Sequence, residues 1–265
     1  MNHGLYDAGD CHIHFWTAGP EGAPLIVLSP GAFTDHSLFE DQVFALSETY
    51  RLLAWDPRGH GRSRPCGRPF TPRQAADDLI GLLDYLGEGK VALLGQSMGG
   101  YVSQEMIFKA PERVSAAILL GCTSSKISLS PLERFLLRVM PPIVAVMPTG
   151  LFKRQAMERS AFTKQAQAKL VKMAAPLTAK DVRAIAKAVA LTVHREEGDD
   201  AISHPILICY GDRDRLDLIP KAAAVWHAET ETSELAVVPE AGHAANLDNP
   251  AAFNRLALAF FGKHL

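Results

Sequence analysis

A serine between two glycines is the first feature of this sequence that could carry chemistry. Residues 95–99 read G-x-S-x-G, directly after the apolar run 91–94 and directly before a helical pattern over 98–109. A strand, a very tight turn and a helix in this order present a serine hydroxyl at the carboxyl end of the strand, and the glycines let neighbouring backbone pass without Cβ clashes. The context predicts that Ser97 is a nucleophile and that the N–H of Met98 points to where an oxyanion would form.

A serine hydroxyl is a weak nucleophile at neutral pH, so a base must lie within hydrogen-bond reach. Among the ten histidines, His243 is favoured because it follows the last predicted strand through a short loop and precedes the final predicted helix. Asp214 lies on the loop after the preceding predicted strand and can orient an imidazole and stabilise its charged form. Asp212 and Asp217 are alternatives on that loop, and the residues just after the earlier strand 116–121 contain no carboxylate.

The second oxyanion donor should come from the loop after an early strand. Residues 29–33 fit this place, and the N–H of Ala32 is our candidate, with Phe33 as the alternative. This loop contains no run of three glycines. Its absence argues against the lipases and esterases that build the oxyanion hole from such a run.

A second constellation, Cys11, His12 and His14, could in principle ligate a metal, because alternate residues of a strand share one face. No third histidine or acidic cluster accompanies these residues, and exposed histidines on an edge hairpin explain the spacing as well. We therefore expect no metal and no organic cofactor.

The bulk composition is ordinary for one globular catalytic domain. The chain has 265 residues, of which 48% are hydrophobic and 21% charged, and a formal net charge of -2, so no nucleic-acid partner is expected. The first residues lack the positive start and apolar run of a signal peptide, which predicts a cytoplasmic location. The most apolar window, 135–152, contains Arg138 and three prolines, so no membrane partner is expected. The scattered cysteines Cys11, Cys66, Cys122 and Cys209 are expected to be reduced, mostly buried thiols.

The order of apolar runs and helical patterns predicts an α/β protein with a mostly parallel sheet. Most of the predicted strands are too continuously apolar to have a wet face. They cover residues 13–16, 25–29, 51–55, 91–95, 116–121, 206–210 and 235–238. Predicted helices cover residues 72–86, 98–109, 219–227 and 250–261. Between 123 and 204 only helical patterns remain, over 132–139, 159–173 and 179–193.

This helical stretch carries an uneven charge. Residues 126–195 contain 13 lysines and arginines against three acidic residues. Two interpretations stay open: the charges cover the solvated outer faces of helices, or their positive field attracts anionic substrates.

Taken together, the motifs resemble those of the α/β-hydrolase superfamily. Residues 56–63 are similar to the family's D-x-R-G-x-G-x-S loop, and the order of Ser97, Asp214 and His243 matches the family's order. The resemblance implies a mostly parallel central sheet flanked by helices, with an all-helical cap inserted after the sixth strand. It divides the chain into a hydrolase core, residues 1–123 and 204–265, and a cap, residues 124–203.

Within the superfamily, residues 27–123 and 242–250 are most similar to 3-oxoadipate enol-lactonases and small carboxylesterases. The resemblance implies a serine hydrolase that cleaves a small ester or lactone, neutral or anionic, through an acyl-enzyme, as a monomer or homodimer. C–C bond hydrolases and cofactor-free perhydrolases share the triad and are the alternatives; a ligand receptor that retains the triad is the rival from a different class. In relatives the cap packs over the nucleophile, so its apolar residues are candidates either for an acyl pocket or for the packing core of the cap helices: Phe135, Leu136, Val139, Met140, Ile143, Val146 and Met147.

Overall fold

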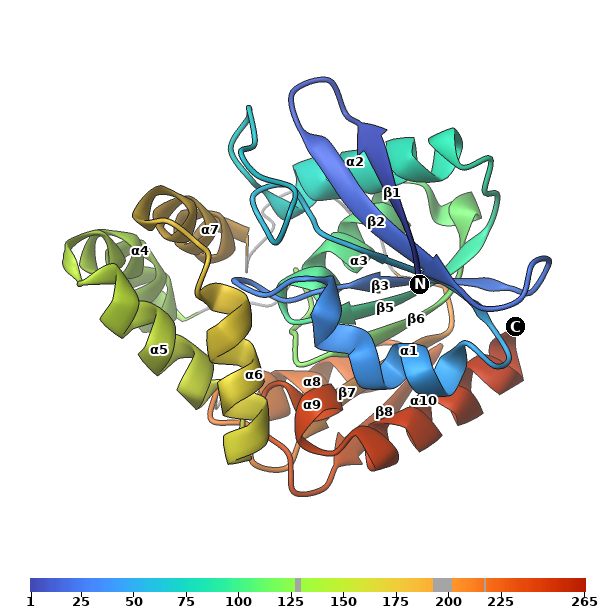
Figure 1. The fold of residues 1–265 in the computed structure, drawn as a ribbon. Helices are drawn as coiled ribbons and strands as arrows, with labels where there is room; N and C mark the ends of the chain where they lie inside the picture. Colours follow the sequence, from blue (N-terminus) through green and yellow to red (C-terminus); the bar gives the residue numbers. More distant parts are fainter. Residues whose placement is uncertain (127–129, 193–201, 217) are drawn as a thin grey trace.

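One mixed sheet organises the part of the chain that the structure describes. In this computed structural model, which describes residues 1–126, 130–192, 202–216 and 218–265, eight strands are ordered β1-β2-β4-β3-β5-β6-β7-β8 (Figure 1). β2 pairs antiparallel with β1 and β4, and every other pairing is parallel. The strands are β1 (Asn2–Asp7), β2 (His12–Ala18), β3 (Leu25–Ser29), β4 (Arg51–Trp55), β5 (Val91–Gln96), β6 (Val114–Leu120), β7 (Ile206–Gly211) and β8 (Ser233–Val238).

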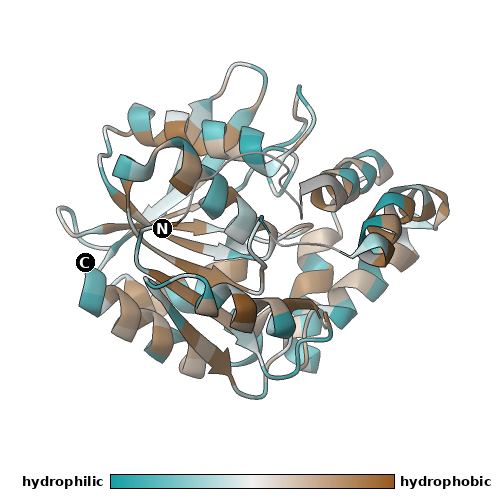
Figure 2. Ribbon diagram, turned by 180° about the vertical axis from the view of Figure 1, so that it is seen from behind, coloured by the Kyte–Doolittle hydropathy of each residue, from teal (hydrophilic) through white to brown (hydrophobic). Residues whose placement is uncertain are grey.

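The expected mostly parallel sheet flanked by helices is confirmed. Alternate residues of β3 enter different cores: Ile26 and Leu28 pack on one face of the sheet, and Leu25 and Val27 pack on the other. Figure 2 shows the apolar strands between layers of helices, and hydrophilic residues lie on the outer faces of these helices. The first face is covered by α1 (Glu40–Leu46) and α10 (Pro250–His264), and the second by α2 (Pro72–Tyr85), α3 (Met98–Lys109) and α8 (Leu218–Ala228).

Four helices lie between β6 and β7 in the described residues, with no strand among them. We call residues 130–192 the helical insertion; in Figure 1 it lies to one side of the sheet, beyond the carboxyl ends of the central strands. Its helices are α4 (Pro131–Val146), α5 (Thr149–Arg159), α6 (Lys164–Ala174) and α7 (Ala179–Thr192).

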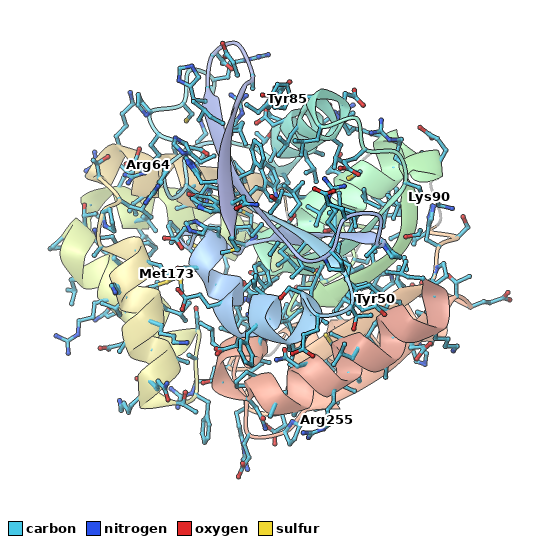
Figure 3. The ribbon with its side chains drawn as sticks, turned by 45° about the vertical axis from the view of Figure 1, so that its right-hand side comes forward. Tyr50, Arg64, Tyr85, Lys90, Met173 and Arg255 are labelled. Atoms are coloured by element: carbon cyan, nitrogen blue, oxygen red, sulfur yellow. The ribbon has the colours of Figure 1, made fainter. Side chains whose placement is uncertain are left out.

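The insertion consists of two helix pairs that belong to different cores. Apolar residues of α5 and α6, among them Met157 and Leu170, join the core on the α1 and α10 face of the sheet. The α4 and α7 pair forms a second cluster around Val144, Val182 and Ile185, against which Ala32 and Phe33 of the loop after β3 pack. Arg64, which Figure 3 shows at the boundary between the sheet and the insertion, links the second pair to the rest of the protein through an ion pair with Asp181 of 3.2 Å.

One predicted helix is wrong in extent. The pattern over 159–173 predicts a single helix, whereas α5 ends at Arg159 and α6 begins at Lys164. We call the connecting residues 160–163 the α5–α6 corner.

The four cysteines are free, and all but Cys66 are buried. Among the described residues, no helix is both long enough and apolar enough to cross a membrane.

Candidate active site

Ser97 forms the turn between β5 and α3. It has φ 52° and ψ −113°, a left-handed conformation that is strained for a residue with a side chain. Its N–H donates to the carbonyl of Leu120 in the neighbouring strand, 2.7 Å away. A Cβ on Gly99 would overlap the carbonyl oxygen of Ser29, so this glycine lets the start of α3 pack directly against the loop after β3. The residue types around the serine thus explain both its strain and its closeness to that loop.

The three residues predicted to act together are brought together. His243 Nε2 lies 2.8 Å from Ser97 Oγ, and His243 Nδ1 lies 2.9 Å from Asp214 Oδ2. A carboxylate at Nδ1 favours the tautomer with its proton there, which leaves Nε2 free to accept the serine proton. The Asp214 carboxylate is fully buried and the imidazole nearly so. The arrangement can therefore activate the partly exposed serine hydroxyl as a nucleophile while its base and carboxylate lie out of solvent.

The structure separates the candidate carboxylates. Asp214 is held by the N–H of Leu216, which donates to its Oδ1 at 2.9 Å. Asp212 instead accepts from the N–H of Ala241 at 3.1 Å, so it fastens the loop that carries the histidine. Asp217 lies outside the described residues.

The two predicted oxyanion donors lie at the expected places. Met98 is the first residue of α3, so its N–H has no acceptor within the helix. Ala32 and Phe33 both line the same cavity as Ser97, and Phe33 has a left-handed backbone with φ 67°. Ala32 and Phe33 both stay candidates for the second donor.

The cavity above Ser97 has a volume of about 160 Å³. Its walls are mainly apolar, and the insertion contributes residues of α5, α6 and the α5–α6 corner rather than of α4. The lining residues are Ala32, Phe33, Thr34, Gln96, Ser97, Ala156, Met157, Ser160, Leu170, Leu216, His243 and Ala244.

None of the seven apolar residues expected between 135 and 147 lines this cavity. Phe135 and Val146 are 60% and 83% exposed, and Met140 packs against the cluster that α4 forms with α7. The pocket hypothesis based on α4 is therefore wrong for this conformation, because α4 pairs with α7 while α5 and α6 face the serine. No local signal in the sequence singled out the α5 and α6 residues, because the helical pattern continues across the α5–α6 corner.

The histidines near the N-terminus form a different arrangement from a metal site. His14 Nδ1 lies 2.9 Å from His3 Nε2 of the neighbouring strand, and Cys11 Sγ faces the carbonyl of Ser63 at 3.5 Å. Within the described residues, no group of three or more histidine, cysteine or acidic side chains could hold a metal ion.

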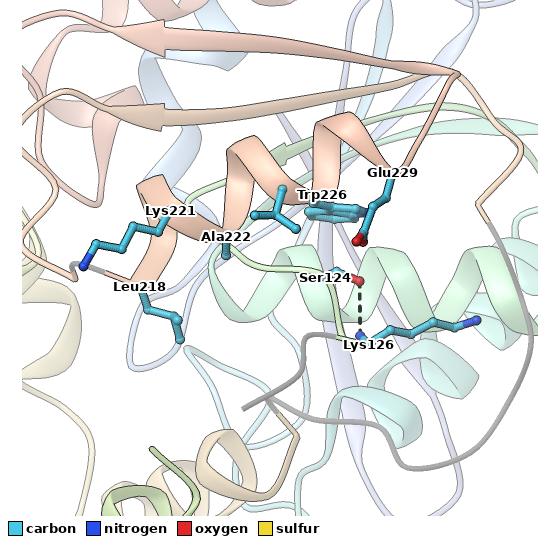
Figure 4. Close-up of a pocket in the computed structure, with 8 residues that line it drawn as sticks. Ser124, Lys126, Leu218, Lys221, Ala222, Trp226 and Glu229 are labelled. Carbon is cyan, nitrogen blue, oxygen red and sulfur yellow. Dashed lines mark hydrogen bonds between the residues drawn. The ribbon is translucent and has the colours of Figure 1, made fainter. Parts of the chain in front are cut away.

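A second cavity of about 330 Å³ lies between α8 and the segment after β6 (Figure 4). Its described lining includes the hydroxyl of Ser124, which accepts from the N–H of Lys126 at 3.1 Å, and the side chains of Trp226 and Glu229. No histidine is among the described residues that line this cavity, whereas Ser97 has His243 beside it, so the cavity near Ser97 is the better candidate for nucleophilic chemistry despite its smaller volume.

Sequence and structure comparisons show which known proteins this chain is similar to. A profile described as "Alpha/beta hydrolase family" matches residues 26–256. The chain is 27% identical over 253 residues to 3-oxoadipate enol-lactonase 2 of Acinetobacter baylyi, covering 93% of this chain and 92% of that protein. Among solved structures, an esterase from Thermogutta terrifontis has a TM-score of 0.83 at 24% identity, with 100% of both chains covered. The enol-lactonase of Burkholderia xenovorans LB400 has a TM-score of 0.78 at 23% identity, with 98% of this chain and 100% of that chain covered.

Proposed function

The chain belongs to the alpha/beta hydrolase family, and from this premise we propose that it is a serine hydrolase that cleaves a small carboxylic ester or lactone. The observation that carries the proposal is the pair of hydrogen bonds that joins Ser97, His243 and Asp214 in one buried line. The similarity to an enol-lactonase along nearly the whole chain supports a lactone or ester as the substrate class.

The proposed cycle begins when a lone pair of Ser97 Oγ forms a bond to the acyl carbon and the hydroxyl proton moves to His243 Nε2. The carbonyl electrons move to the oxygen, which the N–H groups of Met98 and of Ala32 or Phe33 stabilise. Collapse of this intermediate breaks the bond to the leaving oxygen, which takes the proton from the imidazolium. Water, deprotonated by the same histidine, then attacks the acyl-enzyme and releases the acid.

The cavity supports an acyl group larger than acetyl. A dry cavity of about 150 Å³ is known to hold a benzene ring, and the cavity near Ser97 has a similar volume of about 160 Å³. We therefore expect a medium-length or ring-bearing acyl group to react faster than acetate.

The positions of the basic residues in the insertion favour a neutral acyl group over an anionic one. No lysine or arginine is among the described residues that line the cavity. Several basic residues of the insertion are instead used in structural contacts: Arg154 pairs with Glu158, Lys169 pairs with Asp41, and Lys153 donates to the carbonyl of Leu177. These contacts support the interpretation that the charges cover solvated helix faces.

The proposal is tested by labelling with a fluorophosphonate probe and by a series of p-nitrophenyl esters. We expect the wild-type protein to label and Ser97→Ala to lose labelling and turnover. Ser124→Ala, which removes the hydroxyl of the other cavity, should label as the wild type does. A folded wild-type protein that never labels would instead indicate a ligand receptor.

The same assay panel should include lactones and vinylogous diketones. Turnover of the diketones without turnover of esters or lactones would favour a C–C bond hydrolase, and a rate that falls steadily from acetate onward would contradict the expected acyl size.

A further inference from the structure

The α5–α6 corner makes backbone contact with the loop that carries His243. The N–H of Ala244, the next residue, donates to the carbonyl of Ser160 at 2.7 Å. The carbonyl of His243 itself accepts from Gln96 Nε2 at 3.1 Å. The main chain on the carboxyl side of the histidine is therefore fixed both to the insertion and to the residue before the serine.

The amino side of His243 is fixed through one carboxylate, that of Asp248. Its Oδ2 accepts from the N–H groups of Gly242 and Phe162, both at 2.8 Å. Its Oδ1 accepts from the N–H and the hydroxyl of Thr163, at 2.7 and 2.8 Å. One side chain thus joins the residue before the histidine to two residues of the α5–α6 corner by four hydrogen bonds, and bonds to a charged acceptor are the stronger kind.

Close packing at Gly242 shows that this junction has little room to adjust. A Cβ on Gly242 would lie 2.9 Å from the N of Phe162 and 3.2 Å from Asp248 Oδ2. Ala161, inside the corner, is buried, and its carbonyl accepts from the buried Gln167 Nε2 at 3.0 Å. The corner is therefore a packed support for the loop rather than a loose connection.

We propose that Asp248 is a positioning residue: it holds the α5–α6 corner and the Gly242–Ala244 loop together so that His243 stays in line with Ser97 and Asp214. This inference rests on the proposed hydrolase function. Asp248 is not among the described residues that line the cavity, so it acts through the histidine and not on the substrate.

The expected effect follows from the geometry of the acceptor. In Asp248→Asn one oxygen becomes an N–H₂ group, which cannot accept from a backbone N–H. In one amide orientation the bonds to Gly242 and Phe162 are lost, and in the other the bond to the N–H of Thr163 is lost, so in either case the loop must move to relieve a facing donor. A misplacement of about 1 Å at a reacting group costs about 100-fold in rate, so we expect kcat per competent site to fall between about 10-fold and 100-fold, with KM changed less than about threefold.

The experiment compares Asp248→Asn with Asp181→Asn. Asp181 is a matched control in the insertion, because its carboxylate also accepts from the N–H and hydroxyl of a threonine, Thr178, at 2.9 and 2.7 Å, but it does not contact the His243 loop. Competent sites are counted by fluorophosphonate titration, and ester turnover is expressed per titrated site. A purely structural role lowers the number of titratable sites or Tm but leaves the rate per site unchanged.

Two further variants keep the test decisive if Asp248→Asn folds poorly. Asp248→Glu keeps the carboxylate and should recover most of the rate per site. Gly242→Ala retains every acceptor but pushes the corner away by its Cβ, and it should lower the rate per site as Asp248→Asn does.

The inference is overturned if the Asn variant turns over within twofold of the wild type per titrated site, or if Asp181→Asn slows equally. Failure of the underlying hydrolase proposal has a different signature, since the wild type would then neither label nor turn over any ester or lactone.

Discussion

His60 should make the protein sensitive to mild acid. Its side chain is fully buried, its Nδ1 lies 3.2 Å from the carbonyl of Arg58, and its Nε2 has no hydrogen-bond partner within the described residues. The contact with a carbonyl requires the proton on Nδ1, so a second proton would place an unpartnered charged N–H in the interior. Desolvation therefore lowers the pKa of His60 from 6.5 to about 4.

The loss of stability in acid follows from the difference between the pKa of His60 in the unfolded chain and in the folded protein. Below pH 6.5 the unfolded chain binds a proton at this histidine while the folded protein does not, so stability is lost as the pH falls from about 6.5 toward 4. At about 1.4 kcal/mol for each pH unit within that window, a change from pH 7 to pH 5 should lower the free energy of unfolding by about 2 kcal/mol.

Urea denaturation at pH 7, 6 and 5, followed by tryptophan fluorescence, measures this loss. His60→Gln should flatten the pH dependence by about 2 kcal/mol over the interval, whatever its own stability at pH 7. His12→Gln, which removes a largely exposed imidazole, should leave the dependence unchanged. The pKa of His14 is also lowered, chiefly by desolvation, but the wild type and His60→Gln share this effect. Equal pH dependence in wild type and His60→Gln would refute the reasoning.

Three further predictions concern the loops, the site and the pocket. Asp78 accepts two bonds of 2.6 Å from the buried guanidinium of Arg58, so Asp78→Ala should lower the free energy of unfolding by about 3 kcal/mol in urea denaturation. Asp84→Ala, which removes the exposed ion pair with Arg113, should lower it by less than about 1 kcal/mol. Asp214→Asn should lower kcat by about 10⁴-fold at nearly unchanged Tm, because the amide favours the wrong histidine tautomer. Leu170→Ala, at a buried pocket residue, should lower stability by about 2–5 kcal/mol and raise the preference for octanoate over butyrate by about tenfold in kcat/KM.

The site residues could be predicted because each depends on a local pattern and on one rule of topology. The carboxyl ends of parallel strands meet at one edge of a sheet, so a serine after β5, an aspartate after β7 and a histidine after β8 converge without knowledge of any side-chain contact. One strand of the sheet, β1, was missed in the sequence, and the reason is physical. β1 pairs only with β2, its residues are mostly exposed or half-buried, and an edge strand of this kind has no continuous apolar run to identify it.

The insertion was predicted less well because its structure depends on distant residues. Helical periodicity continues through residues 159–173, but the chain breaks at Ser160–Thr163, where the backbone donates to Asp248, 85 residues later for Thr163. A tertiary acceptor of this kind leaves no trace in the local pattern. The apolar stripe of α4 was visible in the sequence, but hydrophobicity alone does not say whether a helix faces the substrate or another helix.

The α5–α6 pair of the insertion has two separate roles at the candidate site. The α5–α6 pair supplies pocket walls through Ala156, Met157 and Leu170, and its corner holds the loop of His243 by main-chain bonds. A change of side chain at those three positions alters the shape of the pocket without touching the junction, whereas a change in length at the corner would displace the base. If the proposed function holds, its acyl selectivity should therefore depend more on those three side chains than on the 27% identity of the chain to an enol-lactonase.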